Sequence, residues 1–106
     1  MLGKFEAQNT KDEKGNPTGG HVSGVGLSIT WQDGPLGRGK ERKEPNGAFV
    51  ETVIAAAMQR LEFYQASQFK CTQNELAIKK LKQALDYLDQ RTKMREKAGT
   101  EGTHKA

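Results

Sequence analysis

Apolar side chains recur every three or four positions through most of the C-terminal half of the chain. This spacing puts them on one face of an α-helix and constrains the fold more than any other feature of the sequence. It predicts a first helix over about residues 48–66 and a second that runs from residue 72 to a stop at Gly99. The second helix has the clearer seam, which fits against another helix. Its members are Ile78, Leu81, Leu85, Leu88 and Thr92.

Polar residues mark the beginning of both predicted helices. Asn46 is a good N-cap candidate for the first helix. Ahead of the second helix, Thr72 and Glu75 have the spacing of a capping box. Cys71 and Leu76 have the spacing of a hydrophobic staple. Only a short connection remains between the two segments, so the sequence predicts an antiparallel helical hairpin.

The N-terminal part has the pattern of a β-hairpin or small antiparallel sheet. Residues 4–8 and 21–32 are strand-like, and residues 11–20 between them are dense in turn formers. Apolar and small or polar residues alternate in the second segment, which predicts one apolar face. The apolar members are Val25, Leu27, Ile29 and Trp31. A two-stranded ribbon is only marginally stable by itself, so we expect it to pack against another part of the protein.

Residues 33–47 are predicted to form a loop, because they hold two prolines, four glycines and alternating charges. Within them, residues 34–40 match the first seven positions of a phosphate-binding P-loop. That motif needs Ser or Thr after the lysine and a helix that starts at once. Glu41 follows instead, and Pro45 blocks a helix soon after. An NTPase is therefore rejected; Arg38 or the glycine amides remain an anion-binding candidate, with a plain surface loop as the alternative.

The fold class expected from these elements is α+β within a single domain. Residues 1–47 form the β-hairpin lobe and loop, residues 48–98 the helical hairpin, and residues 99–106 a polar, flexible tail. Only 34% of the 106 residues are hydrophobic, which predicts a thin core. Such a core needs further stabilisation, by disulfides, a metal or oligomerisation. One cysteine and two histidines exclude a disulfide framework and offer no zinc set. We therefore expect a symmetric homo-oligomer with no metal and no cofactor.

The charge and the distribution of apolar residues argue against a long nucleic acid and a membrane as binding partners. The net charge of +4 suits a few phosphates better than a long nucleic acid, which needs a denser basic face. The beginning of the sequence has no apolar run that would serve as a signal peptide or membrane span. With a single cysteine, this predicts a location in a reducing cytosol and no membrane partner.

The sequence offers no pair of side chains for catalysis, so we expect a protein that is not an enzyme. A general acid or base needs a fixed neighbour that tunes it, and His104 lies in the polar tail. Two pairs remain as ligand-binding candidates. Arg91 and Arg95, one helical turn apart, form either a phosphate fork or a solvated surface at the helix C-terminus. Tyr64 and Asn74 flank the interhelical turn, either to bind a base or as ordinary half-buried residues.

Three short motifs accompany these pairs: C-x-x-N at residues 71–74, RT-x-x-R at 91–95 and EGTH at 101–104. Together with them, residues 46–104 resemble the phage Thoeris anti-defence proteins of the first type. The helical hairpin of that family is shared with the anti-CBASS cyclic-nucleotide sponges. The N-terminal lobe is consistent with the resemblance but not distinctive.

The resemblance implies a function without catalysis. Such proteins bind and sequester cyclic ADP-ribose-type signals, chiefly the glycocyclic form, that bacterial TIR proteins make. Some members also hold cyclic di- or trinucleotides at separate sites, and they assemble as hexamers built from dimers. The resemblance thus implies a small nucleotide and other copies of the chain as partners, in the cytosol of an infected bacterium.

The resemblance also implies roles for particular residues. Tyr64 would stack on an adenine-type ring, and Asn74 would form hydrogen bonds in the same pocket. Arg91 would meet phosphate at the cyclic-oligonucleotide site, with Arg95 close to one of the pockets. Arg38, in the loop after the β-hairpin, would be a further phosphate contact.

The tail would act as a lid through Thr103 and His104, over a neighbouring pocket and ordered by ligand. Two residues depart from the family pattern. Tyr64 stands where phenylalanine is expected, and Tyr87 stands where many relatives have tryptophan. Two other functions remain open on the residues: a protein–protein adaptor that uses the apolar stripe of the hairpin, and a weak nucleic-acid binder that uses the basic face of the second helix.

Overall fold

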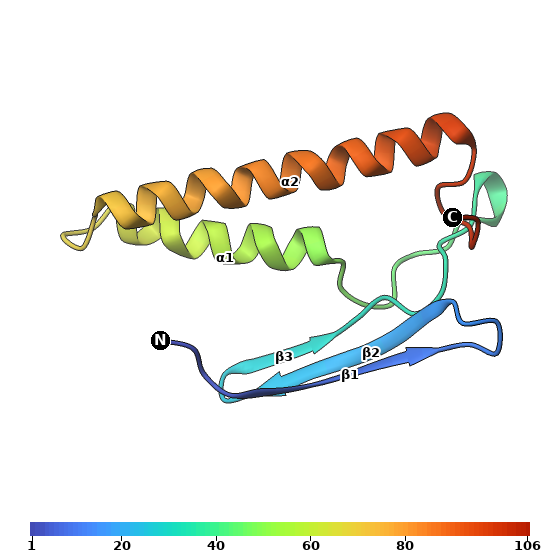
Figure 1. The fold of residues 1–106 in the computed structure, drawn as a ribbon, viewed down its shortest axis with the longest axis horizontal. Coiled ribbons are helices and arrows are strands. Elements are labelled where there is room, and N and C mark those ends of the chain that lie inside the picture. The colour runs from blue at the N-terminus through green and yellow to red at the C-terminus, as the bar shows by residue number, and fades with distance from the viewer. The chain divides into compact units, whose positions relative to one another are not determined.

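A computed structural model describes the whole chain, residues 1–106, and contains two compact units. One unit comprises Met1–Phe49 together with Thr100–Ala106, and the other comprises Val50–Gly99. Figure 1 shows three strands followed by two helices, so the α+β prediction is confirmed. The elements are β1 (Phe5–Lys11), β2 (Pro17–Gly24), β3 (Leu27–Thr30), the short 3-10 helix η1 (Gly39–Glu41), α1 (Val50–Gln65) and α2 (Thr72–Ala98).

The sheet is antiparallel in the order β1-β2-β3. Its first turn is shorter than the predicted segment 11–20, because β1 continues to Lys11 and β2 begins at Pro17. Asp12 closes this turn: its Oδ1 accepts hydrogen bonds from the backbone N–H groups of Lys14 and Asn16, each at 2.9 Å. The Asp12 carboxylate therefore stabilises a tight turn where the sequence predicted a longer loop.

The prediction of one long strand over residues 21–32 is wrong, because a two-residue turn divides that segment into β2 and β3. Gly24 pairs with Leu27 across the turn, and Gly26 adopts φ 73°. Glycine takes such a positive φ without steric cost. Val25 consequently lies at the tip of the turn, fully exposed, and does not share a face with Ile29.

Side-chain amides fasten the two ends of the long loop to each other. Gln32 Oε1 accepts hydrogen bonds from the backbone N–H groups of Asn46 at 2.8 Å and Gly47 at 3.3 Å. Asn46 Oδ1 accepts one from the N–H of Asp33 at 2.8 Å. The prediction that Asn46 caps the first helix is therefore wrong: α1 begins at Val50, and the Asn46 amide is used to close the loop.

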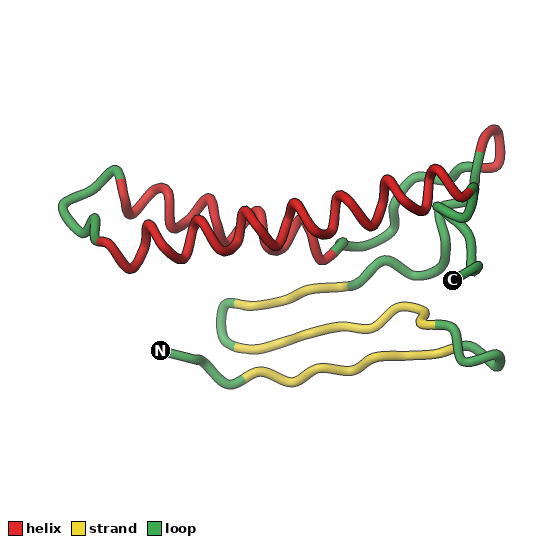
Figure 2. The backbone as a smooth tube through the Cα atoms, turned by 45° about the horizontal axis from the view of Figure 1, so that its top comes forward, coloured by secondary structure: helices red, strands yellow, loops and turns green.

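The two helices lie side by side and antiparallel, as Figure 2 shows. The half-buried side chains between them keep the predicted three- and four-residue spacing, with Val53, Ile54, Met58 and Leu61 on α1 and Ile78, Leu81, Leu85 and Leu88 on α2. With 27 residues against 16, α2 is eleven residues longer than α1. At 1.5 Å per residue it therefore extends about 16 Å beyond its partner helix.

The beginning of α2 differs from the predicted capping box by one residue. The N-cap is Cys71, whose Sγ accepts a hydrogen bond from the backbone N–H of Asn74 at 3.4 Å, while Thr72 is already helical. With the N-cap at Cys71, Cys71 and Leu76 do not have the positions of a hydrophobic staple, and Leu76 is half exposed. At the other end the predicted stop is confirmed, since Gly99 has φ 76° and its N–H bonds the carbonyls of the last turn.

No side chain in the chain is fully buried. Several large apolar side chains in the helical unit are half or more exposed: Val50, Phe63, Phe69, Leu76, Tyr87 and Met94. Neither unit therefore has a dry core of its own. Neither helix combines the length with the apolar composition that crossing a membrane requires.

Candidate functional site

Tyr64 lies in the last turn of α1, with 37% of its surface exposed. The guanidinium carbon of Arg60 lies 4.9 Å from the ring centroid of Tyr64 and 4.9 Å from that of Phe63. Arg60 Nε also donates a hydrogen bond to the Tyr64 hydroxyl at 3.2 Å. The two rings are 6.1 Å apart and tilted by 53°. This end of the hairpin thus presents a partly exposed aromatic ring beside a cation.

Asn74 lies at the same end of the hairpin, half-buried in the first turn of α2. The turn between the helices is closed by Gln65, whose Oε1 accepts from Cys71 N at 2.9 Å and whose Nε2 donates to Cys71 O at 3.1 Å. Ser67 Oγ adds a hydrogen bond to the carbonyl of Tyr64 at 2.6 Å. Tyr64 and Asn74 are therefore held on either side of a fastened turn.

Arg91 and Arg95 lie at the opposite end of α2, in the part that extends beyond α1. Seventeen residues separate Asn74 from Arg91, which is about 26 Å along the helix. That distance corresponds to between about seven and eight nucleotide steps of 3.4 Å each. A ligand of one to three nucleotides cannot contact both pairs on one chain, so they are two separate places.

The local charge around the arginine pair is partly compensated. Lys93 Nζ lies 2.9 Å from Asp89 Oδ2, one helical turn away. This hydrogen bond, with the charge of Asp89, raises the pKa of Lys93. Arg91 is exposed and Arg95 half-buried. Lys93 is therefore engaged with Asp89, and Arg91 and Arg95 remain the candidates for a phosphate contact.

Arg38 belongs to the other unit, where its Nη1 donates a hydrogen bond to the carbonyl of Glu101 at 2.8 Å. Arg42 Nη1 forms an ion pair with Glu101 Oε2 at 2.8 Å. The N–H of Gly37 donates to the carbonyl of Gly102 at 2.9 Å. These three contacts join the long loop to the C-terminal tail, and we call them the loop–tail clasp.

The clasp fixes the surroundings of the predicted lid residues. Thr103 is half-buried and its hydroxyl donates a hydrogen bond to Thr100 O, while His104 is exposed. Gly102 has φ 77°, and a Cβ built there would lie 2.4 Å from the carbonyl oxygen of Gly37. Only glycine fits so close an approach. Sequence reasoning missed Arg42 and the side chain of Glu101, because a contact across 59 positions leaves no local pattern.

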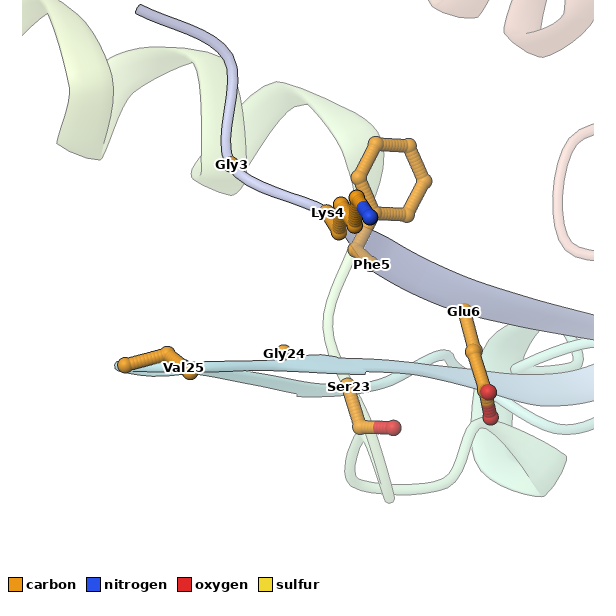
Figure 3. Close-up of a pocket in the computed structure, with 7 residues that line it drawn as sticks. All are labelled: Gly3, Lys4, Phe5, Glu6, Ser23, Gly24 and Val25. Atoms are coloured by element: carbon orange, nitrogen blue, oxygen red, sulfur yellow. The ribbon is translucent and has the colours of Figure 1, made fainter.

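An open depression of about 760 Å³ lies at the end of the sheet, and none of the predicted ligand residues lines it (Figure 3). It is lined by the segment around Phe5 and the turn at Val25. Figure 3 shows the Phe5 ring on one side of the strand and Glu6 on the other, as strand alternation requires. Its polar lining residues are Lys4, Glu6 and Ser23, and we assign it no ligand.

Known proteins resemble a large part of this chain, which includes most of the helical unit. Residues 26–93 match the family model described as Acb2/Tad1, hairpin domain. This stretch includes Tyr64, Asn74 and Arg91 and ends before Arg95 and the tail. The chain is also 47% identical over 77 residues to "Thoeris anti-defense 1" of Bacillus phage SBSphiJ7. The aligned part is 73% of this chain and 51% of the relative, so the chain spans about half the length of that protein.

The family match covers both sides of the interhelical turn and most of α2, which are the elements that position the candidate residues. It agrees with the resemblance carried by the C-x-x-N and RT-x-x-R motifs. The chain belongs to the Acb2/Tad1 hairpin-domain family.

Proposed function

We propose that this chain is a phage anti-defence protein that binds and sequesters a cyclic ADP-ribose-type immune signal, chiefly the glycocyclic form, without degrading it. Membership in the family and the name of the phage relative support this proposal. Sequestration in the cytosol of the infected host keeps the signal from its effector. Binding without turnover needs complementary contacts and no general base.

The observation that carries the proposal is the pairing of Tyr64 and Asn74 at one fastened end of the hairpin. A partly exposed ring can stack on a base, and stacking of this kind is worth about 1–3 kcal/mol per base. A neighbouring amide supplies both a donor and acceptors for the edge of that base. Such a site binds a nucleotide through stacking and through hydrogen bonds to the edge of its base.

A second ligand class fits the other end of α2. Because Arg91 lies about 26 Å from Asn74, the arginine pair belongs to a separate site for phosphate. Guanidinium groups pair with phosphate oxygens in a bidentate manner, which suits cyclic di- or trinucleotides. Arg38, whose Nη1 donates a hydrogen bond to the Glu101 carbonyl, is proposed as a further phosphate contact, with Thr103 and His104 of the tail as the lid.

The proposed active form is a homo-oligomer, from dimer to hexamer. The exposed apolar side chains of the helical unit, such as Leu76 and Tyr87, require cover, and other copies of the chain can supply it. A symmetric assembly also multiplies the number of sites that a short chain provides.

The deciding experiment measures the thermal midpoint with and without excess cyclic ADP-ribose isomers and a panel of cyclic di- and trinucleotides. A ligand at about a thousand times its Kd adds roughly 4 kcal/mol of stability, which is a shift of many degrees. The ligand is then recovered and analysed. A large shift with intact ligand supports sequestration, whereas recovery of a cleaved product contradicts it.

Variants locate the site. Tyr64→Ala and Asn74→Ala are expected to abolish the shift caused by the ADP-ribose signal. Tyr64→Phe, which keeps the ring, is expected to retain most of the shift, and Gln73→Ala, an exposed neighbour of Asn74, is the matched control. Unchanged affinity in the Tyr64→Ala/Asn74→Ala double variant would overturn the site assignment.

The exposed apolar side chains also favour a second candidate, a protein–protein adaptor that uses the hairpin. An adaptor shows no stabilisation by any nucleotide. It is monomeric or dimeric alone and retains a host protein on the hairpin. Absence of a thermal shift across the whole panel, with such retention, would replace sequestration with this function.

A further inference from the structure

We propose that Arg60 is a positioning residue that holds the Tyr64 ring in the orientation in which it stacks on a nucleotide base. This inference rests on the proposed function and deepens it, because it concerns a residue of the same site. Arg60 does not contact the ligand in this proposal. It acts through the ring that does.

Three contacts tie the Arg60 side chain to the aromatic pair. Its guanidinium lies 4.9 Å from the centroids of both the Phe63 and Tyr64 rings, within the range of cation–π interactions. Its Nε–H donates to the Tyr64 hydroxyl at 3.2 Å. One contact with each ring face and one with the polar tip of Tyr64 define both the position and the tilt of that ring.

The helix explains why these side chains meet. Phe63 and Tyr64 lie three and four residues after Arg60, on the same face of α1. Long side chains on a helix point back toward its N-terminus, which carries both rings over the turn that holds Arg60. The contact therefore needs no other part of the protein and exists before any ligand arrives.

Tyr64 needs such support because its ring is only partly packed. Because 37% of the surface of Tyr64 is exposed, its ring is not enclosed on all sides by packing that would select one rotamer. Helical aromatic residues populate two χ1 rotamers, near 180° and −60°. If only a fraction of the free protein holds the binding rotamer, the apparent affinity falls by that fraction. Arg60 raises this fraction toward one.

A direct role for Arg60 on a ligand phosphate would behave differently. A phosphate contact depends on charge, so Lys at position 60 would largely preserve it, and removal of the charge would reduce the dependence of affinity on salt. A positioning role depends on the planar guanidinium and its Nε–H donor, which lysine lacks. The two roles therefore separate in Arg60→Lys and in the salt dependence of Arg60→Ala.

The first arm of the test uses ligand-free protein and fluorine NMR. The chain has two tyrosines, so 3-fluorotyrosine in a Tyr87→Phe background gives one signal, from position 64. Arg60→Ala and Arg60→Lys are expected to shift and broaden this signal, while Lys79→Ala, an exposed cation on α2, leaves it unchanged. The same signal position and width in all variants would overturn the proposal.

The second arm measures the affinity for glycocyclic ADP-ribose by calorimetry. Arg60→Ala and Arg60→Lys are each expected to weaken binding about three- to tenfold, with the salt dependence unchanged. In a Tyr64→Phe background, which removes the hydroxyl acceptor, Arg60→Ala is expected to have a smaller effect. Unchanged affinity, or a loss confined to Arg60→Ala with a reduced salt dependence, would overturn the positioning role.

The two arms separate this inference from the proposed function. A wild-type chain that binds none of the nucleotides overturns the proposed function, and with it the purpose assigned to the ring. The fluorine signal of the free protein still shows whether Arg60 holds Tyr64. Circular dichroism of each variant confirms that the helices are intact.

Discussion

Arg42 Nη1 and Glu101 Oε2 lie 2.8 Å apart, so a loop residue and a tail residue 59 positions away form an ion pair. Both side chains are partly exposed, and a pair of this kind contributes at most about 1 kcal/mol. The specificity of the clasp therefore comes mainly from the backbone contact beside it, where Gly37 and Gly102 approach each other too closely for a side chain.

Replacement of Gly102 by alanine is expected to open the clasp. A non-glycine residue at φ 77° costs about 1–2 kcal/mol, and the new Cβ would also collide with the Gly37 carbonyl. Amide exchange at Gly37, whose N–H bonds the Gly102 carbonyl, is expected to speed up. Gly26→Ala is the matched control, because it has φ 73° with no atom near its Cβ. Equal exchange at Gly37 in both variants would contradict the clasp.

The turn between β1 and β2 is expected to depend on pH through Asp12. The side-chain hydrogen bond from Asn16, followed by that residue's backbone N–H, holds the pKa of Asp12 below its ordinary value of 3.8. Because the folded-state pKa is lowered, the stabilisation is complete above pH 3.8 and is lost as pH falls through the folded value.

Carboxyl-carbon NMR of Asp12 measures this effect. Asn16→Ala is expected to raise the pKa of Asp12 toward 3.8, because it removes the side-chain donor. Lys14→Ala keeps the backbone N–H of residue 14 and is expected to leave the low value in place. An identical titration curve in both variants would exclude Asn16 as the cause.

The two ends of α2 are expected to bind different ligands. Arg91→Ala together with Arg95→Ala is expected to weaken binding of cyclic trinucleotides at least tenfold, since each charge-assisted hydrogen bond is worth about 1.5–3 kcal/mol. The affinity for glycocyclic ADP-ribose is expected to change less, because Tyr64 and Asn74 lie about 26 Å away. Calorimetry with both ligands, with Lys97→Ala as the control, checks this; parallel losses for both ligands would show a single site.

Self-association is expected to depend on the exposed apolar residues of the hairpin. Tyr87→Glu and Leu76→Glu place a charge on surfaces that other copies are proposed to cover, and both are expected to shift the molar mass in light scattering toward the monomer. Leu2→Glu, which changes an exposed apolar residue outside the helices, is expected to leave the mass unchanged. A wild-type chain that is already monomeric at high concentration would refute the proposed assembly.

The helical hairpin was predictable because its signal is periodic and local. The spacing of Leu81, Leu85 and Leu88 defines one face regardless of what lies opposite, and Gly99 ends the helix by its own conformation. The helix beginnings were less predictable, because several polar residues compete for the cap. A thiol at Cys71 accepts a hydrogen bond only weakly, and the pattern favoured the hydroxyl of Thr72 instead.

The sheet and the clasp show where sequence reasoning stops. Alternation continues through Val25 whether or not the strand does, so the turn at Gly26 leaves the pattern intact while it reverses the chain. The clasp depends on distant backbone groups that carry no periodic signal. Likewise, spacing alone left Tyr64 and Asn74 with ordinary alternatives, and family resemblance supplied their proposed roles.

Because no side chain of the single chain is fully buried, the proposed assembly would link the stability of this protein to its concentration. In the proposed assembly, most apolar surface leaves water only when copies associate, so the folded fraction rises with the concentration of the chain. Dilution would then lower the concentration of folded binding sites by a larger factor than it lowers the concentration of the chain. During an infection, each newly synthesised copy would add its own site and also preserve the sites of the copies already present.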